Sequence, residues 1–285
     1  MDVKNHNMNK EKPIMRKRFR IIAFLAFFFG IIMAVSQYFE FVSKTVYEES
    51  VSHLTEVFHQ SDNMLGELTH KNLMYLHMWS EYLQDAPSES KIRDYIDKAQ
   101  KDAGFLYFYF LSADGNYKMT TGETGYLGLQ ENIEDEIQKG NDIITNAAVP
   151  GKSQMLVFAS PKAHGSYQGF KYDAIAIAYE NADIVNVLDI SAFNGKAKSY
   201  VLHPDGRVVI DHSLESWGNV YNFFGILREH TDISEKEILK ISKKFKEGHT
   251  GAMLLNLDGK DYYLVYEKSG IQDWVFLGLE IGRAH

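Results

Sequence analysis

The pattern that decides the fold lies in Phe105-Leu-Tyr-Phe-Tyr-Phe-Leu-Ser-Ala-Asp-Gly-Asn-Tyr-Lys-Met-Thr-Thr121. Aromatic and branched residues fill Phe105 to Leu111, as in a strand, and Asp114-Gly115 is a dipeptide typical of hairpin turns. Asn116 to Thr121 is then expected to return as a second strand. The same layout recurs 91 residues later in Ser199-Tyr-Val-Leu-His-Pro-Asp-Gly-Arg-Val-Val-Ile-Asp211. Repetition of a whole hairpin indicates two related modules.

Further elements complete each module. A third Asp-Gly hairpin spans Gly251 to Glu267, and the remaining expected strands are Gln154 to Ser160, Tyr172 to Glu180 and Asp273 to Ile281. Helices are expected over residues 130–140, 182–188 (capped by Asn181) and 232–247, and a turn-rich loop over 161–169. We therefore predict an α+β fold: two antiparallel sheets in tandem, with helices on their faces.

A long helix is expected before these modules. Ser36 to Asp85 contains no Pro and one Gly, and steps of four and three residues link Tyr47, Val51, Leu54, Phe58, Leu65, Leu68, Tyr75, Trp79 and Tyr82. Ser61 and Asn72 interrupt this stripe. It suits either a dimer stalk or a helix packed on its own domain. Ser88 can cap a second helix that runs to about Ala103.

The apolar run Ile21-Ile-Ala-Phe-Leu-Ala-Phe-Phe-Phe-Gly-Ile-Ile-Met-Ala-Val35 is long enough, with its flanking aromatics, to cross a bilayer. Seven Lys/Arg against two acidic residues precede it, so the positive-inside rule keeps the leader cytoplasmic and exports the rest. The alternative is a cleaved signal peptide, with Ala34-Val35-Ser36 as a small-x-small site. We expect a single-pass protein of the inner membrane whose bulk is extracytoplasmic.

Composition excludes several classes of function. The formal charge is −8, and because the leader contributes +5, the remaining residues carry −13. Such a balance argues against nucleic acid and anionic lipid surfaces as partners. With no Cys, disulfides, thiolate metal sites and a cysteine nucleophile are excluded.

In this order of elements the chain resembles an extracytoplasmic double Cache sensor domain, a tandem of PAS-like modules found in bacterial transmembrane receptors. The resemblance covers about residues 40–281, with a membrane-distal module ending near Glu180, a short helical crossover and a membrane-proximal module. Tyr200 to Asp211 is similar to the strand pair that opens the second module of such domains.

The resemblance implies these segments: a cytoplasmic leader (1–20), a transmembrane helix (21–41), the long and second helices (42–103), a distal module (104–190), a proximal module (191–281) and a tail (282–285) expected to be truncated. It also implies that a small ligand binds the distal module and shifts the long helix. We expect the receptor to work as a homodimer and to need no cofactor. Such receptors normally have a second transmembrane helix and an output domain, such as a diguanylate cyclase or histidine kinase. This sequence has neither, so we expect a fragment of a receptor, or a stand-alone sensor that acts through a partner.

The resemblance places the ligand over the distal sheet. Alternation puts Tyr107 and Tyr109 on one face, and the row Ala174, Ala176 and Ala178, with Tyr172 in the same register, leaves room beneath aromatic walls or lets a helix pack closely. Asp173 could pair with an amine, and Lys118 or Lys171 with a carboxylate. The predicted ligand-binding residues are Tyr107, Tyr109, Tyr117, Lys118, Phe158, Tyr172, Asp173, Ala174 and Ala176. The Arg-x-Trp-Tyr stretch of the amino-acid-binding subset is missing, which argues against an amino-acid ligand.

Alternative functions have less support in the sequence. His203 and His212 flank the second hairpin and could meet at a metal, although strand alternation and the turn role of Asp205 oppose this. Ser160, His164 and Asp173 are the nearest approach to a catalytic triad, in a loop region without a nucleophile elbow. We therefore predict no catalytic and no metal-binding residues, with an exported enzyme or a non-catalytic adaptor as the alternatives to a sensor.

Overall fold

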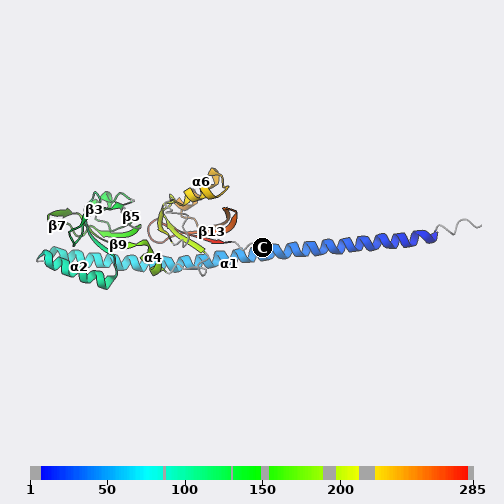
Figure 1. Ribbon diagram of the computed structural model, residues 1–285, viewed down its shortest axis with the longest axis horizontal. Helices are drawn as coiled ribbons and strands as arrows, with labels where there is room; N and C mark the ends of the chain where they lie inside the picture. The colour runs from blue at the N-terminus through cyan, green and yellow to red at the C-terminus, as the bar shows by residue number, and fades with distance from the viewer. Residues whose placement is uncertain are drawn as a thin grey trace, which may run out of the picture. The chain divides into compact units, whose positions relative to one another are not determined.

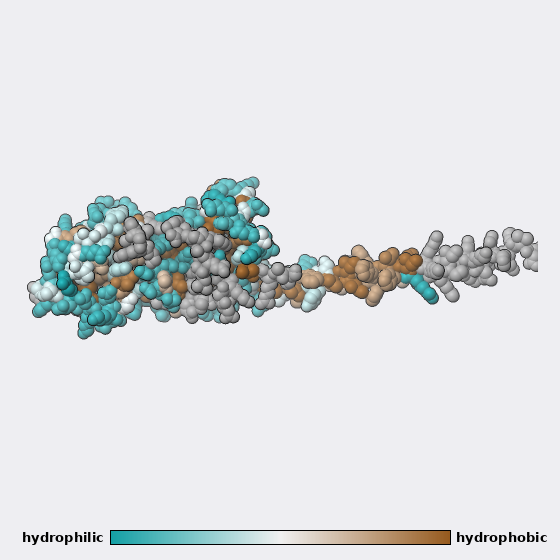
Figure 2. All heavy atoms as spheres, viewed as in Figure 1, coloured by the Kyte–Doolittle hydropathy of each residue, from teal (hydrophilic) through white to brown (hydrophobic). Residues whose placement is uncertain are grey.

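The computed structural model describes residues 8–85, 88–129, 131–148, 154–188, 197–211 and 222–281. The chain divides into two compact units, residues 1–52 and 53–285. In the first unit, helix α1 (Met8–Asp85) exposes every residue from 21 to 41, and Figure 2 shows this stretch as a band of hydrophobic atoms. Its most apolar 18-residue window has a mean hydropathy of 2.1, so by length and composition it can cross a membrane.

In the second unit, the predicted stripe on α1 is core. Of the predicted positions, Leu54, Phe58, Leu65 and Trp79 are buried, together with Ser61 and Asn72, which interrupt the apolar pattern. Leu76 and Leu83, which lie outside the predicted stripe, are buried as well, whereas Leu68, Tyr75 and Tyr82 are half-buried. Of the two roles open for this stripe, packing on the chain's own domain therefore holds over this range.

The first sheet has seven strands in the order β3-β2-β1-β9-β6-β5-β4, each antiparallel to its neighbours. The strands are β1 (Tyr107–Leu111), β2 (Asn116–Lys118), β3 (Thr124–Tyr126), β4 (Gly128–Leu129), β5 (Ile143–Ala148), β6 (Met155–Ser160) and β9 (Ala174–Glu180). One face packs on α1, where the Trp79 ring lies 6.0 Å from that of Phe108. Helices α2 (Glu89–Ala103) and α3 (Glu134–Lys139), and the small sheet of β7 (Gly165–Tyr167) and β8 (Phe170–Tyr172), complete this module.

The second sheet has the order β11-β10-β14-β13-β12. Its strands are β10 (Ala197–Leu202), β11 (Val208–Asp211), β12 (Gly251–Leu257), β13 (Lys260–Lys268) and β14 (Val275–Ile281). Helices α5 (Phe223–His230) and α6 (Glu235–Lys246) supply Phe224 and Phe245 to the core on one face. The other face packs on α1, with Phe58 stacked 5.8 Å from Phe276. Figure 1 shows both sheets beside the second half of α1.

All three Asp-Gly hairpins form where the sequence predicts them. Gly115, Gly206 and Gly259 have φ of +86°, +87° and +77°, a region that glycine adopts without strain. Asp258 also has a positive φ of 50°, so the third hairpin has the two left-handed residues of a type I′ turn. The predicted tandem of antiparallel sheets is confirmed.

Local details differ from prediction. The strand expected over Tyr172 to Glu180 is two strands, β8 and β9, with a bend at Asp173, and the loop over 161–169 contains β7. Ser88 precedes α2, but its hydroxyl lies 3.1 Å from that of Ser90 and makes no capping bond. Strand β5 and helix α5 were not predicted.

Asn181 does not cap α4 (Asn181–Leu188) as predicted, because its side chain bonds the second sheet. Its Nδ2 donates to the carbonyl of Asp211 (2.7 Å) and its Oδ1 accepts from the amide of Asp211 (3.1 Å). Asn146 and Gln154 both donate to the carbonyl of Val208, at 3.1 and 2.9 Å. Three amide side chains of the first module thus satisfy the free edge of β11, an interaction that we call the β11 clamp.

Gly278 is a point of close approach between the second sheet and α1. A Cβ built there would lie 2.7 Å from Cδ2 of Leu54 and 2.8 Å from Cζ of Phe58. We expect Gly278→Ala to lower the free energy of unfolding by about 1–3 kcal/mol in urea titrations, because both core side chains must leave their rotamers. Gly225→Ala in α5 is the control: no atom lies within 4 Å of its Cβ, so it should be neutral or slightly stabilising. Equal losses in both variants would contradict this account.

The β11 clamp can be tested at Asn181. We expect Asn181→Ala to cost about 1–2 kcal/mol, because it leaves the amide and carbonyl of Asp211 without their partner. Hydrogen exchange at Asp211 should accelerate at the same time. Asn186→Ala, at an exposed position of α4, is the matched control and should leave both values unchanged.

Candidate functional site

The turn between β1 and β2 is built around one carboxylate. Oδ1 of Asp114 accepts from the hydroxyl of Ser112 and from the amide of Asn116 (3.2 Å), and Oδ2 accepts from Nδ2 of Asn116 (2.6 Å). These bonds, that from Ser112 above all, lower the pKa of Asp114. The turn therefore presents a fixed negative charge at the surface of the first sheet module.

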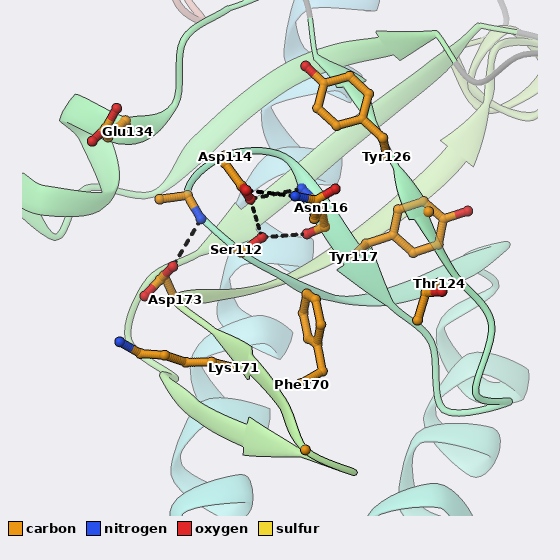
Figure 3. Close-up of a pocket in the computed structure, with 13 residues that line it drawn as sticks. Ser112, Asp114, Asn116, Tyr117, Thr124, Tyr126, Glu134, Phe170, Lys171 and Asp173 are labelled. Carbon is orange, nitrogen blue, oxygen red and sulfur yellow. Dashed lines mark hydrogen bonds between the residues drawn. The ribbon is translucent and has the colours of Figure 1, made fainter.

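Asp173 ties this turn to the bend between β8 and β9. Its Oδ2 accepts from the amide of Ala113 at 3.0 Å, and its own amide donates to the carbonyl of Leu111 at 2.9 Å. Figure 3 shows the carboxylate of Asp173 directed at the base of the turn. The carboxylate is thus held by main-chain geometry in a partly buried position.

An open depression of about 950 Å³ lies over the turn, β3 and the β7–β8 hairpin. Its lining residues are Ser112, Ala113, Asp114, Asn116, Tyr117, Thr124, Gly125, Tyr126, Glu134, Gly169, Phe170, Lys171 and Asp173. The lining contains three carboxylates, one ammonium group and three aromatic rings. This arrangement favours a small solute that carries a positive charge.

Two of the nine predicted residues, Tyr117 and Asp173, line the depression. Tyr107, Tyr109, Ala174 and Ala176 lie in the adjoining core cluster of the same sheet face. The Tyr109 ring is fully buried, 4.7 Å from that of Tyr117, and burial followed by the neighbouring tyrosines raises its pKa far above the ordinary value. These four residues support the floor of the site and do not line it.

Lys118, Phe158 and Tyr172 lie on the opposite side of the sheet. Nζ of Lys118 donates to the carbonyl of Gln168 (3.0 Å), and Phe158 pairs with Ile177 and contacts the Tyr179 ring. The expectation that Tyr172 shares the register of the alanines is wrong. Tyr172 ends a separate strand, and its ring contacts that of Phe110 at 4.9 Å.

Sequence reasoning missed the polar lining supplied by Ser112, Asn116, Tyr126 and Glu134. The Asp-Gly signal predicts the turn at Asp114 but not that β3 folds back beside it. Tyr126 is a large aromatic residue that remains 58% exposed, which would have marked the site only once the strand order was known.

Neither the metal nor the triad alternative gains support. In the described part of the chain, no group of three or more His, Asp or Glu residues is placed to hold a metal, and His212 lies outside it. Ser160 is fully buried and donates to Oδ1 of Asp142 at 2.8 Å. The carboxylate of Asp173 accepts a hydrogen bond from the amide of Ala113, so it stabilises the turn.

Comparison with protein-family models and with curated protein sequences gives no match. Solved structures do match. The extracellular domain of a protein described as a histidine kinase, mmHK1S-Z2, superimposes with a TM-score of 0.55 at 14% identity, over 82% of this chain and 97% of that one. Methyl-accepting chemotaxis protein X gives 0.56 at 12% identity, over 84% and 99%. The ligand-binding domain of the amino-acid chemoreceptor PctB of Pseudomonas aeruginosa PAO1, solved with L-Arg, gives 0.52 at 14%, over 83% and 96%.

The chain has the double Cache fold. The match extends over nearly the whole of each sensor domain and includes both sheets, which confirms the predicted fold class. In double Cache terms, the depression belongs to the first of the two sheet modules, the one predicted to be distal to the membrane.

Asp173 allows the site's framework to be tested without a ligand. We expect Asp173→Ala to destabilise the protein by about 1–2 kcal/mol, because the amide of Ala113 loses a charged acceptor that is only partly shielded from water. Asp173→Asn keeps an acceptor oxygen and should lose less. Urea unfolding of the two variants side by side measures the difference, and an identical loss would show that this bond does not hold the turn.

Proposed function

We propose that the chain is the extracytoplasmic ligand-sensing region of a transmembrane signalling receptor. The observation that carries this proposal is the depression over the β1–β2 turn, which charged and aromatic side chains from the turn, β3 and the β7–β8 hairpin line together. Concave sites with a few fixed polar groups are the usual form of small-molecule sites. The double Cache fold, shared with receptor sensor domains, supports the same function.

The ligand we propose is a small cationic solute such as an amine. The lining holds the carboxylates of Asp114, Glu134 and Asp173 against the single ammonium group of Lys171. Tyr126 and Phe170 supply aromatic faces on which a cation can rest. The PctB domain was solved with L-Arg and with L-Gln, both of which carry an amino group.

Transmission would run through α1, which bonds both sheets. Nε2 of His77 lies 2.8 Å from Oδ2 of Asp142, an acid that also accepts from Ser160 at the end of β6. In the second module, the amide of Gly270 donates to Oδ2 of Asp62 at 3.0 Å. A ligand that moves the first sheet would bias the helix, and a coupling of about 1–3 kcal/mol is typical of such signals.

The remaining parts of the proposal follow from the first unit. We propose that residues 21–41 span the inner membrane once, that the sheet modules are extracytoplasmic, and that the receptor works as a homodimer. The exposed apolar band and the basic leader support the first two statements.

A thermal-shift screen of the full chain in lipid nanodiscs tests the proposal. The panel contains amines, guanidinium compounds, carboxylates, purines and sugars. A ligand at 100 times its Kd adds about 2.7 kcal/mol, which raises the Tm by roughly 5–10 °C for a domain of this size. We expect hits among the cationic solutes, because carboxylates dominate the lining.

Variants assign any hit to the site. Asp173→Asn should remove most of the shift, whereas Asp183→Asn, at an exposed position of α4, should preserve it. A folded protein that responds to nothing in the panel would count against a ligand sensor. A shift that persists in Asp173→Asn would place the ligand elsewhere.

A further inference from the structure

The two sheet modules meet at a histidine. His203 directly follows β10, and its side chain is 5% exposed. Its Nδ1 lies 3.4 Å from Oε1 of Glu131, which belongs to the segment just before α3 in the other module. The indole of Trp274 stands edge-on to the imidazole, 6.1 Å between centroids. A titratable ring is therefore enclosed at a contact between modules.

The enclosure leaves one ring nitrogen unsatisfied. Nε2 of His203 is buried without a hydrogen-bond partner among the described residues. The charged groups around the ring are Glu131 from the first module, Asp205 and Arg207 from the same turn, Lys246 from α6, and Asp273 from the β13–β14 connection, which together line a hollow of about 290 Å³. Asp205 pairs with Arg207 (2.7 Å) and Asp273 with Lys268 (3.2 Å).

We propose that His203 makes the docking of the two modules sensitive to protonation: the neutral ring fits its enclosure, whereas a protonated ring leaves it and loosens the junction. This inference goes beyond the proposed function because it requires no small-molecule ligand. The group that binds is a proton, and it binds at His203, whose Nδ1 lies 3.4 Å from Oε1 of Glu131 in the first module. This place is separate from the depression over the β1–β2 turn.

The reason lies at Nε2. A neutral ring with its hydrogen on Nδ1 directs that hydrogen toward Glu131 and leaves Nε2 as an uncharged acceptor. Protonation adds an N–H at Nε2, where the described residues offer no acceptor, and a buried donor without a partner is costly. In agreement, burial and then the charge of Arg207 lower the pKa of His203, and Asp205 offsets only part of this effect.

The contact between the modules is expected to weaken as the pH falls. Because the pKa of His203 is lowered on folding, its contribution to the stability of the folded state is present above the ordinary pKa of 6.5 and is lost as the pH falls below that value. Glu131 acts in the opposite direction. Burial raises the pKa of its carboxyl, so its contribution is present at low pH and is lost as pH rises.

Hydrogen exchange of the full chain in nanodiscs, measured from pH 7.5 to 5 and corrected for intrinsic rates, tests the proposal. In the wild type, exchange in β10 and β11 should increase several-fold as the pH falls below 6.5. His203→Gln, which cannot gain a charge, should lose this increase. His249→Gln is the matched control, because His249 is 62% exposed beside Glu247, and should behave as the wild type.

Glu131→Gln keeps the proposal testable if His203→Gln fails to fold. The carboxylate of Glu131 favours the charged form of the His203 ring. Its loss in Glu131→Gln should therefore move the exchange transition of β10 and β11 to lower pH. A flat profile in the wild type, a pH response in His203→Gln equal to that of the wild type, or an unmoved transition in Glu131→Gln would each overturn the inference. None of these results depends on a response in the amine screen.

Discussion

Burial of one helical stripe is the constraint on which the rest of the structure depends. From Leu54 to Leu83, α1 is core for both sheets, and fully burying an aliphatic or aromatic side chain contributes about 1.5–3 kcal/mol. Polar contacts fix where the helix sits: Asn72 accepts from the hydroxyl of Tyr179 (2.8 Å), and Asp62 accepts from the amide of Gly270 (3.0 Å). Neither sheet can move along α1 without exposing apolar surface or breaking such a bond. A shift of either sheet is therefore coupled to the position of the helix.

Features set by local sequence were predictable. Asp-Gly turns fix the three hairpins, and the period of the apolar stripe fixes α1, because both follow from backbone preference and spacing. The interpretation of that stripe was open, since the same spacing serves a dimer seam or a core. Asn181 shows the limit: its sequence position suits a helix cap, but its amide bonds the edge of β11, a strand whose place beside it no local pattern reveals.

The candidate site was predictable only in part, for the same reason. Tyr117 and Asp173 flank recognisable turns, whereas Tyr126 joins them only because β3 returns antiparallel to β2. Alternation assigns faces correctly within one strand but cannot relate strands whose register is unknown. Phe158 illustrates this: opposite Ile177, it falls on the face that packs on α1, and the neighbouring Val157 and Ala159 take the face of the alanines.

The junction between the modules combines two kinds of contact with different chemistry. The amides of the β11 clamp do not titrate near neutral pH, so they hold the edge of β11 equally well across the physiological range. The pKa of the His203 side chain is lowered by burial from its ordinary value near neutrality, and this residue lies on the same hairpin, at the other end of the turn from β11. The junction therefore combines one contact that does not change with pH, the β11 clamp, with one that does, the contact between His203 and Glu131. Loss of the contact at His203 would leave the modules joined by the β11 clamp and by the stripe on α1.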